Sequence, residues 1–191
     1  CGYVSPNASC GKCCTFGKTI SKFELKFMKR IIMLLCLVMA FSGCEKDDIC
    51  VDETTPQLVL EFYDISNPTV LKNVVNLKVT GDGMTDALNT FNGVSTISLP
   101  LKTNEDTTKY HLLLNSNSST ASNEDVLEFN YTRENVYVSR ACGYKTVFEL
   151  NNANGLVLTD AITPDGLWIQ DTNLQTNSII TENEVHLKIY F

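Results

Sequence analysis

The sequence predicts an all-β protein whose core is a single antiparallel β-sandwich of the immunoglobulin-like type, with about seven or more strands. Short segments of alternating apolar and polar residues recur about every 10–15 residues from position 57 onward. Asp-Gly or Asn-Gly pairs, which supply the positive φ angles of tight hairpins, occur at 82–83, 92–93, 154–155 and 165–166. No helical pattern of ordinary length interrupts these segments. A closed small barrel is the alternative architecture.

The individual strands follow from a hydrophobic period of two. The first strand covers 58–63, and Asn67-Pro68 after it favours one turn of helix through Val70 and Leu71. Further strands are predicted at 75–80, 97–101, 110–114, 127–131, 136–138, 144–150, 155–159, 167–169 and 185–191. Pro100 lacks a ladder donor and so predicts an edge strand or a bulge, while the polar segment 115–125 predicts an exposed loop. The last strand has the cleanest pattern, and we expect it inside a sheet.

A secretory signal is predicted ahead of this domain. Lys29 and Arg30 precede an apolar run of 11 residues, 31–41, which is shorter than the roughly 20 residues that span a bilayer. The run ends in Phe41-Ser42-Gly43-Cys44, which resembles the lipobox of bacterial lipoproteins, although leucine is commoner at the first position. This resemblance implies that Cys44 is lipidated, for example with palmitate, and becomes the mature N-terminus. An ordinary N-terminal helix of a soluble domain is the alternative.

Four segments follow from this interpretation. Because no Met precedes Met28, residues 1–27 are predicted to be a mis-annotated upstream extension. Residues 28–43 are the signal peptide, 44–56 a tether and 57–191 the β-sandwich. The Cys-x-x-Cys-Cys at 10–14 has no second ligand pair at zinc-like spacing, so neither a metal nor a cofactor is predicted.

Charge and cysteine content change once residues 1–43 are removed. The remaining 148 residues carry nine basic and 21 acidic side chains, a net charge of about −12, which disfavours nucleic acid as a partner. With Cys44 lipidated, Cys50 and Cys142 remain, and two cysteines in an exported domain predict one disulfide. A free reactive thiol near Lys145 is the alternative.

The tether carries a second signal directly behind the lipidated cysteine. Lys46, Asp47 and Asp48 resemble the pattern that directs lipoproteins to the cell surface in some Gram-negative lineages. The expected location is therefore the cell envelope, as an outer-membrane lipoprotein held by its N-terminal lipid, with surface display and a periplasm-facing anchor both open.

The search for catalytic chemistry predicts no enzyme. His111 and His186 have no ligand partner at suitable spacing, and no nucleophile elbow or phosphate-binding loop is present. The acidic pairs at 47–48, 105–106 and 124–125 are predicted to be solvated turn residues. The turn 81–86 is predicted to be a plain hairpin rather than a weak Ca²⁺ site, and 106–108 resembles an Asp-Thr-x acceptor for O-glycosylation.

Two functions remain open at this point. The first is a non-enzymatic binding or accessory module for another envelope component. The second is a surface domain that binds or hydrolyses carbohydrate, with Trp168, Tyr137 and Tyr144 as sugar-stacking rings, unless these rings pack in the core.

Several motifs together resemble an uncharacterised family. The chain resembles a domain-of-unknown-function family of Gram-negative envelope lipoproteins. The motifs that carry the resemblance are the lipobox followed by 44–50, the strand 58–64, Ile-Ser-Leu-Pro-Leu at 97–101 and Val-Ser-Arg-Ala-Cys-Gly at 138–143. The resemblance extends over 44–191 and implies a one-domain lipoprotein without an assigned activity. It also suggests an accessory role beside an outer-membrane barrel protein.

Overall fold

The computed structural model describes residues 22–40, 50 and 54–191. The chain divides into two units, Cys1–Asp47 and Asp48–Phe191, and each is described by itself. In the first unit, α1 (Lys22–Ala40) is a 19-residue helix that begins upstream of Met28. Among the described residues, no helix combines the length and the apolar character that crossing a bilayer requires. Cys44 and the export pattern at 46–48 lie outside the described residues.

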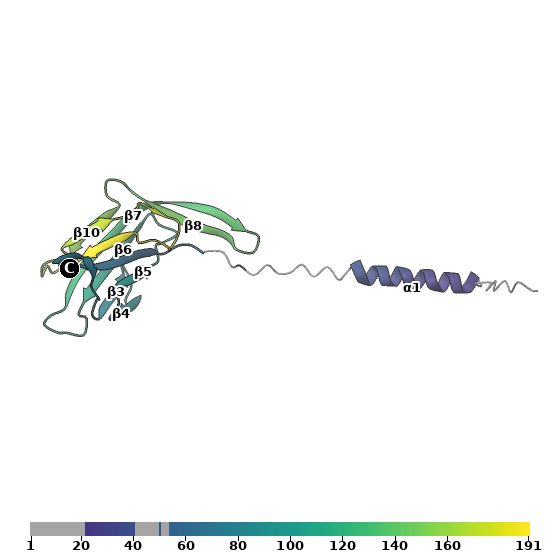
Figure 1. The fold of residues 1–191 in the computed structure, drawn as a ribbon, viewed down its shortest axis with the longest axis horizontal. Coiled ribbons are helices and arrows are strands. Elements are labelled where there is room, and N and C mark those ends of the chain that lie inside the picture. Colours follow the sequence, from purple (N-terminus) through teal and green to yellow (C-terminus); the bar gives the residue numbers. More distant parts are fainter. Residues whose placement is uncertain (1–21, 41–49, 51–53) are drawn as a thin grey trace, which may run out of the picture. The chain divides into compact units, whose positions relative to one another are not determined.

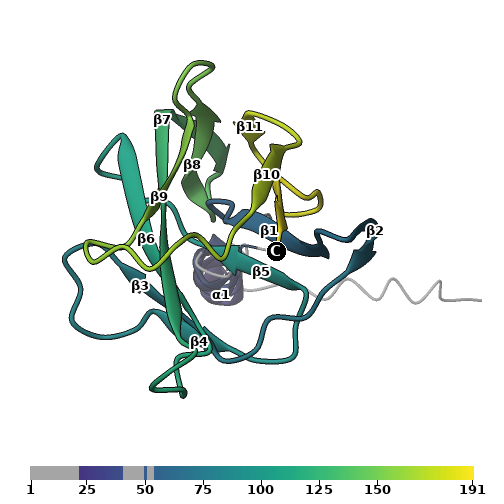
Figure 2. The ribbon, with the colours of Figure 1, turned by 90° about the vertical axis from the view of Figure 1, so that its left-hand side faces the viewer.

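The second unit is built from strands that form two sheets (Figures 1 and 2). The first sheet has the order β10-β12-β1-β2, with β5 also paired to β1. The second has the order β11-β8-β7-β6-β3-β4, with β9 also paired to β7. In chain order, the strands are β1 (Leu58–Asp64), β2 (Asn67–Leu71), β3 (Leu77–Gly81), β4 (Asn89–Phe91), β5 (Thr96–Leu99), β6 (Thr107–Leu114), β7 (Asn123–Ser139), β8 (Gly143–Leu150), β9 (Leu156–Asp160), β10 (Asp171–Leu174), β11 (Ser178–Ile179) and β12 (Leu187–Tyr190). The predicted all-β sandwich is confirmed.

The core lies between the two sheets and is filled by the inward residues of each strand. The first sheet contributes Leu58, Leu60, Phe62, Ile97, Leu99, Leu187 and Ile189, and the second contributes Leu77, Val79, Leu112, Leu127, Phe129, Tyr131, Phe148 and Leu150. These are the alternating positions that the period of two predicts. At about 25 cal/mol per Å² of apolar surface removed from water, this burial is the main stabilising term of the domain.

Pairing departs from a wholly antiparallel sandwich at one place. β1 runs parallel to β12, with Leu60 opposite Leu187 and Phe62 opposite Ile189, while the other described pairings are antiparallel. The last strand therefore lies inside the first sheet, between β10 and β1, as its pattern predicted. β5, which ends before Pro100, pairs with β1 alone among the described strands, so the edge position is confirmed.

Three local predictions were wrong. Asn67-Pro68 opens strand β2 rather than a helical turn, because this exposed segment pairs with the end of β1. The strand predicted from Val75 begins at Leu77, because Asn76 has a φ of 45° and interrupts the alternation, which buries Val74 and exposes Val75. Residues 167–169 form no strand, since the Ile169 N–H bonds a side chain instead of a neighbouring strand.

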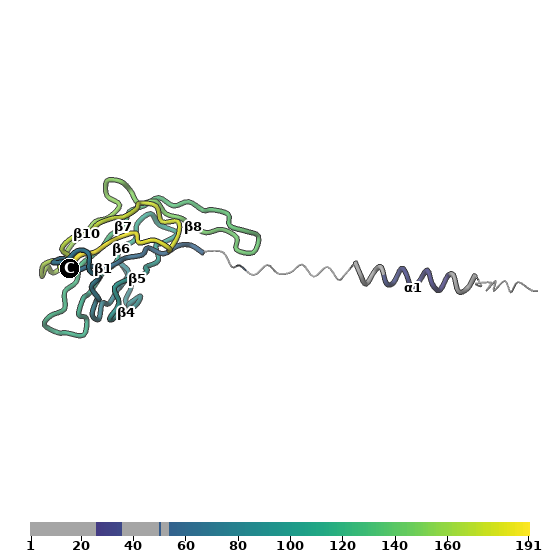
Figure 3. The backbone as a smooth tube through the Cα atoms, viewed as in Figure 1, coloured from purple at the N-terminus to yellow at the C-terminus, as the bar shows by residue number. Residues whose placement is uncertain are grey.

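β7 is the longest strand, and its two halves pair with different neighbours. Residues 123–130 pair with β6, whereas residues 131–139 pair with β8 alone. The paired residues 131–150 form a hairpin arm that projects beyond the other strands (Figures 1 and 3). We call residues 136–145 the arm tip.

Candidate functional site

The disulfide between Cys50 and Cys142 is confirmed, with 4.9 Å between the two Cα atoms. Cys142 lies in the turn of the hairpin arm, where its N–H donates to Ser139 Oγ over 3.1 Å. Gly143 follows with a φ of 70°, which a residue with a Cβ adopts at a cost. The bond joins the tether to the arm tip. Cys142 is therefore not the free reactive thiol that was the alternative.

Two tyrosines on the arm tip face each other across the strands. Tyr137 lies opposite Tyr144, and their ring centroids are 5.4 Å apart in an edge-to-face arrangement. Tyr137 is 54% exposed and Tyr144 is 71% exposed. Trp168, by contrast, is buried, donates from Nε1 to the Leu112 carbonyl and packs edge-on against Phe191. The three rings considered for sugar stacking therefore do not form one platform.

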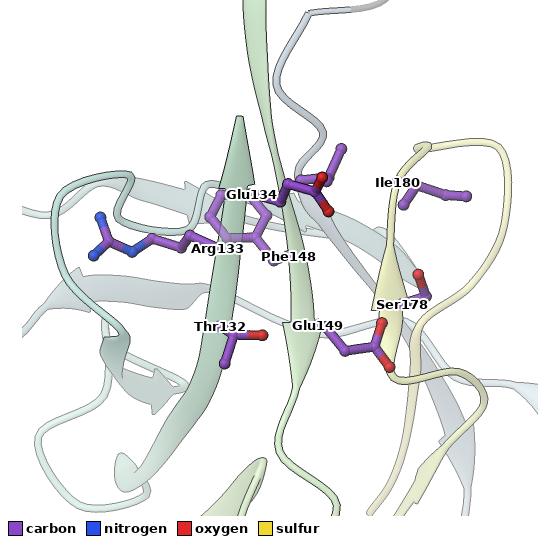
Figure 4. Close-up of a pocket in the computed structure, with 8 residues that line it drawn as sticks. Thr132, Arg133, Glu134, Phe148, Glu149, Ser178 and Ile180 are labelled. Carbon is purple, nitrogen blue, oxygen red and sulfur yellow. The ribbon is translucent and has the colours of Figure 1, made fainter. Parts of the chain in front are cut away.

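The base of the hairpin arm carries a solvent-open hollow of about 420 Å³, which we call the arm hollow (Figure 4). Three strands line it, because Thr132 lies opposite Glu149, which in turn lies opposite Ser178. Its lining residues are Thr132, Arg133, Glu134, Val147, Phe148, Glu149, Ser178 and Ile180. The set holds two carboxylates and two hydroxyls but no histidine, cysteine or lysine, so it suits hydrogen-bond donors and cations rather than nucleophilic chemistry.

Arg133 points away from these carboxylates (Figure 4). Its Nε donates to Asp106 Oδ1 over 2.6 Å, and its Nη1 donates to the Thr103 carbonyl. These bonds connect the arm to the loop before β6 and help to line a second open hollow of about 430 Å³. Arg133 is thus a positioning residue for the base of the arm, and the arm hollow keeps its acidic character.

Asp125 corrects the prediction of an exposed loop at 115–125. The loop ends before Asn123, and Asp125 is a fully buried residue of β7. Its Oδ2 accepts the N–H of Ile169 over 2.7 Å, while its Oδ1 and the Asn123 Oδ1 are buried without a hydrogen-bond partner in the described structure. Burial raises the pKa of the Asp125 carboxyl to about 6, and the nearby charges of Asp160 and Asp165 add to this increase. Hydrogen bonds from the backbone N–H groups of Ile169 and Trp168 lower the pKa and so oppose it. Glu124-Asp125 is therefore not a solvated turn pair.

Replacing Asp125 with asparagine is expected to change how stability depends on pH. The folded domain holds the Asp125 proton more tightly than the unfolded chain, whose aspartates have a pKa near 3.8. The stability from this proton is thus fully present below about pH 4 and is lost as pH rises through about 6. Urea unfolding from pH 4 to pH 7 should show wild type losing about 2.5 kcal/mol relative to D125N, which keeps an acceptor for Ile169. Parallel curves for the two proteins would contradict this expectation.

The remaining titratable candidates have ordinary structural surroundings. His186 is buried, its Nδ1 accepts the Val59 N–H over 2.9 Å, and burial lowers the pKa of its imidazole. His111 on β6 contacts Glu124 of β7 over 2.9 Å and Asp82, just after β3, over 3.5 Å at the surface. In the described part of the chain, no group of three or more His, Cys, Asp or Glu side chains is arranged to hold a metal ion.

The other predicted surface features also receive a place in the fold. The turn 81–86 opens the connection of the β3–β4 hairpin, where Gly83 has a φ of 79°. Glu105 pairs with Lys102, and Asp106 with Arg133, in the loop before β6. Thr107, the acceptor of the Asp-Thr-x triplet, donates its hydroxyl to Asn130 Oδ1, while Thr108 is buried.

Sequence reasoning identified the disulfide but missed the arm hollow and the buried Asp125. The hollow combines residues of the β7–β8 hairpin with residues of β11, which pairs with β8 from almost 30 positions further along the chain. Asp125 stands in a polar stretch, and its apolar neighbours Val126 and Leu127 were the one available signal that the strand begins early.

Comparison with known proteins gives one family-level finding. Residues 76–191 match the model of a family described as a family of unknown function, DUF6452. The match begins just before β3 and continues through β12, so it covers more than half of the chain, including the hairpin arm. No curated protein and no solved structure matches the chain.

Proposed function

Since the chain belongs to the DUF6452 family of unknown function, we propose that this member is a lipid-anchored protein of the bacterial cell envelope whose sandwich binds or supports another envelope component. The Cys50–Cys142 disulfide carries the proposal. Disulfides form and persist in oxidising compartments, such as the periplasm and the cell surface, and are rare in the cytosol. The disulfide begins six residues after the lipobox-like cysteine, so one short segment holds both marks of export.

The proposed anchor is the lipid on Cys44, which follows the small residues Ser42 and Gly43. Each acyl methylene buried in the membrane contributes about 0.8 kcal/mol, so two or three chains hold a protein permanently. Lys46, Asp47 and Asp48 would then direct the anchored protein to the outer surface.

The arm hollow is the surface that we propose for the partner. Its two carboxylates and two hydroxyls match a basic or amide-rich segment, which a loop of an outer-membrane barrel protein can supply. We propose binding rather than catalysis, because the hollow lacks a nucleophile with an adjacent base. Crosslinking from Glu149 in intact cells tests this role. The role loses its support if no envelope partner is recovered while the domain turns over a glycan.

Replacing Cys44 with serine is expected to remove the lipid. Cells fed labelled palmitate should label the wild-type chain and leave C44S unlabelled, and C44S should move from the membrane to the soluble fraction after lysis. Cys36→Ser is the matched control, because this cysteine lies within the proposed signal peptide and should not affect the label. Palmitate that remains on C44S would overturn the proposed anchor.

A further inference from the structure

The disulfide limits how far the arm tip can lie from the anchor. Cys44 and Cys50 are six residues apart, so even a fully extended chain separates their Cα atoms by at most about 20 Å. The disulfide adds 4.9 Å between the Cα atoms of Cys50 and Cys142. Cys142 in the arm tip is thus held within about 25 Å of the lipidated residue.

Without the disulfide, the same tether would set no orientation. The first strand begins at Leu58, 14 residues after Cys44, which corresponds to a reach of about 50 Å. This length exceeds the dimensions of the domain core, so any face could then approach the membrane. The disulfide therefore selects the end of the domain that carries the arm tip.

The arm tip has the composition of a surface that meets lipid headgroups. Residues 135–148 contain no acidic side chain and carry Arg140 and Lys145, although residues 44–191 contain 21 acidic and nine basic residues. Tyr137 and Tyr144 are exposed on one face of the tip, and Val136 is exposed on the other. Tyrosine is enriched at membrane interfaces, where its ring meets apolar chains and its hydroxyl meets water. Basic residues are attracted to anionic headgroups, whereas most of the acidic domain is repelled.

No described strand covers this surface. Residues 136–139 of β7 pair with β8 alone, and β11 pairs with β8 at Phe148 and Glu149, below the tip. The arm also projects beyond the other strands (Figure 1), so the tip can reach a flat surface before the rest of the domain does.

From this geometry we infer that the arm tip rests on the membrane that holds the anchor, with Tyr137 and Tyr144 in its headgroup layer. This inference rests on the proposed lipid anchor at Cys44. It orients the domain upright, with the arm hollow a short distance above the membrane. At that height, the hollow faces the exposed loops of a neighbouring membrane protein.

Quenching by brominated lipid tests this orientation with the full lipidated chain. The protein is reconstituted in vesicles of phosphatidylethanolamine and phosphatidylglycerol, roughly three to one, brominated near the headgroup end of the acyl chains. Tyr144→Trp reports on the tip, and its fluorescence is expected to fall roughly twofold. Trp168 is the single native tryptophan and is buried, so its signal in the unsubstituted chain serves as the baseline.

Ile162→Trp is the matched control on an exposed site. Ile162 is 97% exposed and follows β9, whose last residue Asp160 pairs with Asp125. Asp125 is 14 residues along β7 from Ser139, about 45 Å away, so the control lies at the opposite end of the domain. Its fluorescence is expected to change by less than about a tenth. Reducing the disulfide should abolish the difference between the two variants.

The outcomes separate the orientation from the anchor. Quenching of Y144W without quenching of I162W supports the inference, and Tyr137→Trp provides a second reporter at the tip. Equal quenching of both sites, or of neither, in vesicles that retain the labelled protein overturns the orientation and leaves the anchor intact. Protein that carries no lipid on Cys44 and does not stay with the vesicles overturns both.

Discussion

Replacing Cys142 with serine is expected to lower the free energy of unfolding by up to about 4–5 kcal/mol. The Cys50–Cys142 disulfide spans a sequence separation of 92 residues, and closing so large a loop removes much entropy from the unfolded chain in the chain-entropy model. Guanidinium unfolding of the wild type and C142S in non-reducing buffer measures the difference.

Two controls separate the crosslink from other effects of the substitution. Cys50→Ser breaks the same bond from its other end and should reproduce the C142S curve. Reduction of the wild type should reproduce the C142S curve. A loss below about 1 kcal/mol in both cases would show that the unfolded chain is already restricted without the bond, against the chain-entropy model.

Replacing Phe62 with alanine is expected to cost about 3–5 kcal/mol. Phe62 is 0% exposed in the centre of β1, and its ring centroid lies 6.1 Å from that of Phe191 and 6.5 Å from that of Trp168. The substitution removes apolar contact and leaves a cavity between the two sheets. Urea unfolding followed by circular dichroism gives the magnitude.

The size of the cavity provides the internal control for this position. Phe62→Leu fills much of the space and should lose clearly less stability than F62A, while Ile162→Ala on the exposed loop should change stability by less than about 0.5 kcal/mol. Equal losses for F62L and F62A would mean that ring geometry rather than cavity volume decides the cost.

Most of the fold was predictable because one physical rule controls it. Wherever one strand face is buried, the period of two persists, as in Leu58, Leu60 and Phe62, and the strand follows. The rule fails where the backbone itself changes. The positive φ of Asn76 reverses which of Val74 and Val75 is buried, and no hydrophobic pattern records such a change.

Other misses come from partners that lie far away in the chain. All residues of β2 are exposed, so its sequence shows no alternation of buried and exposed positions. The segment is extended because β1 supplies its backbone hydrogen-bond partners. Asp125 is buried because the segment before β10 passes over it and donates the Ile169 N–H. The parallel alignment of β12 beside β1 depends on how the whole chain is connected, which local patterns do not encode.

The candidate site was predictable only in its covalent part. Once the predicted signal region and the cysteine predicted to carry lipid are set aside, counting leaves Cys50 and Cys142 as a pair, and the disulfide confirms this pairing. The arm hollow has no such signature, since Glu134 and Glu149 stand in ordinary alternating strands and meet through the register of β7 and β8. Tyr137 and Tyr144 were identified as notable rings, but their exposure could be learned only from the structure.

The parallel pairing of β1 with β12 also governs when the domain can fold. The Val59 N–H bonds the imidazole of His186 across 127 residues of sequence, and the strands themselves meet at a similar separation. Pairing across so large a sequence separation is slow, and one edge of β1 stays unpaired until the last strand has been delivered. A chain that emerges from N- to C-terminus therefore cannot close the first sheet early, as the proposed export in an unfolded state requires. During that interval, the unpaired edge of β1 and its apolar side chains are open to pairing with other chains.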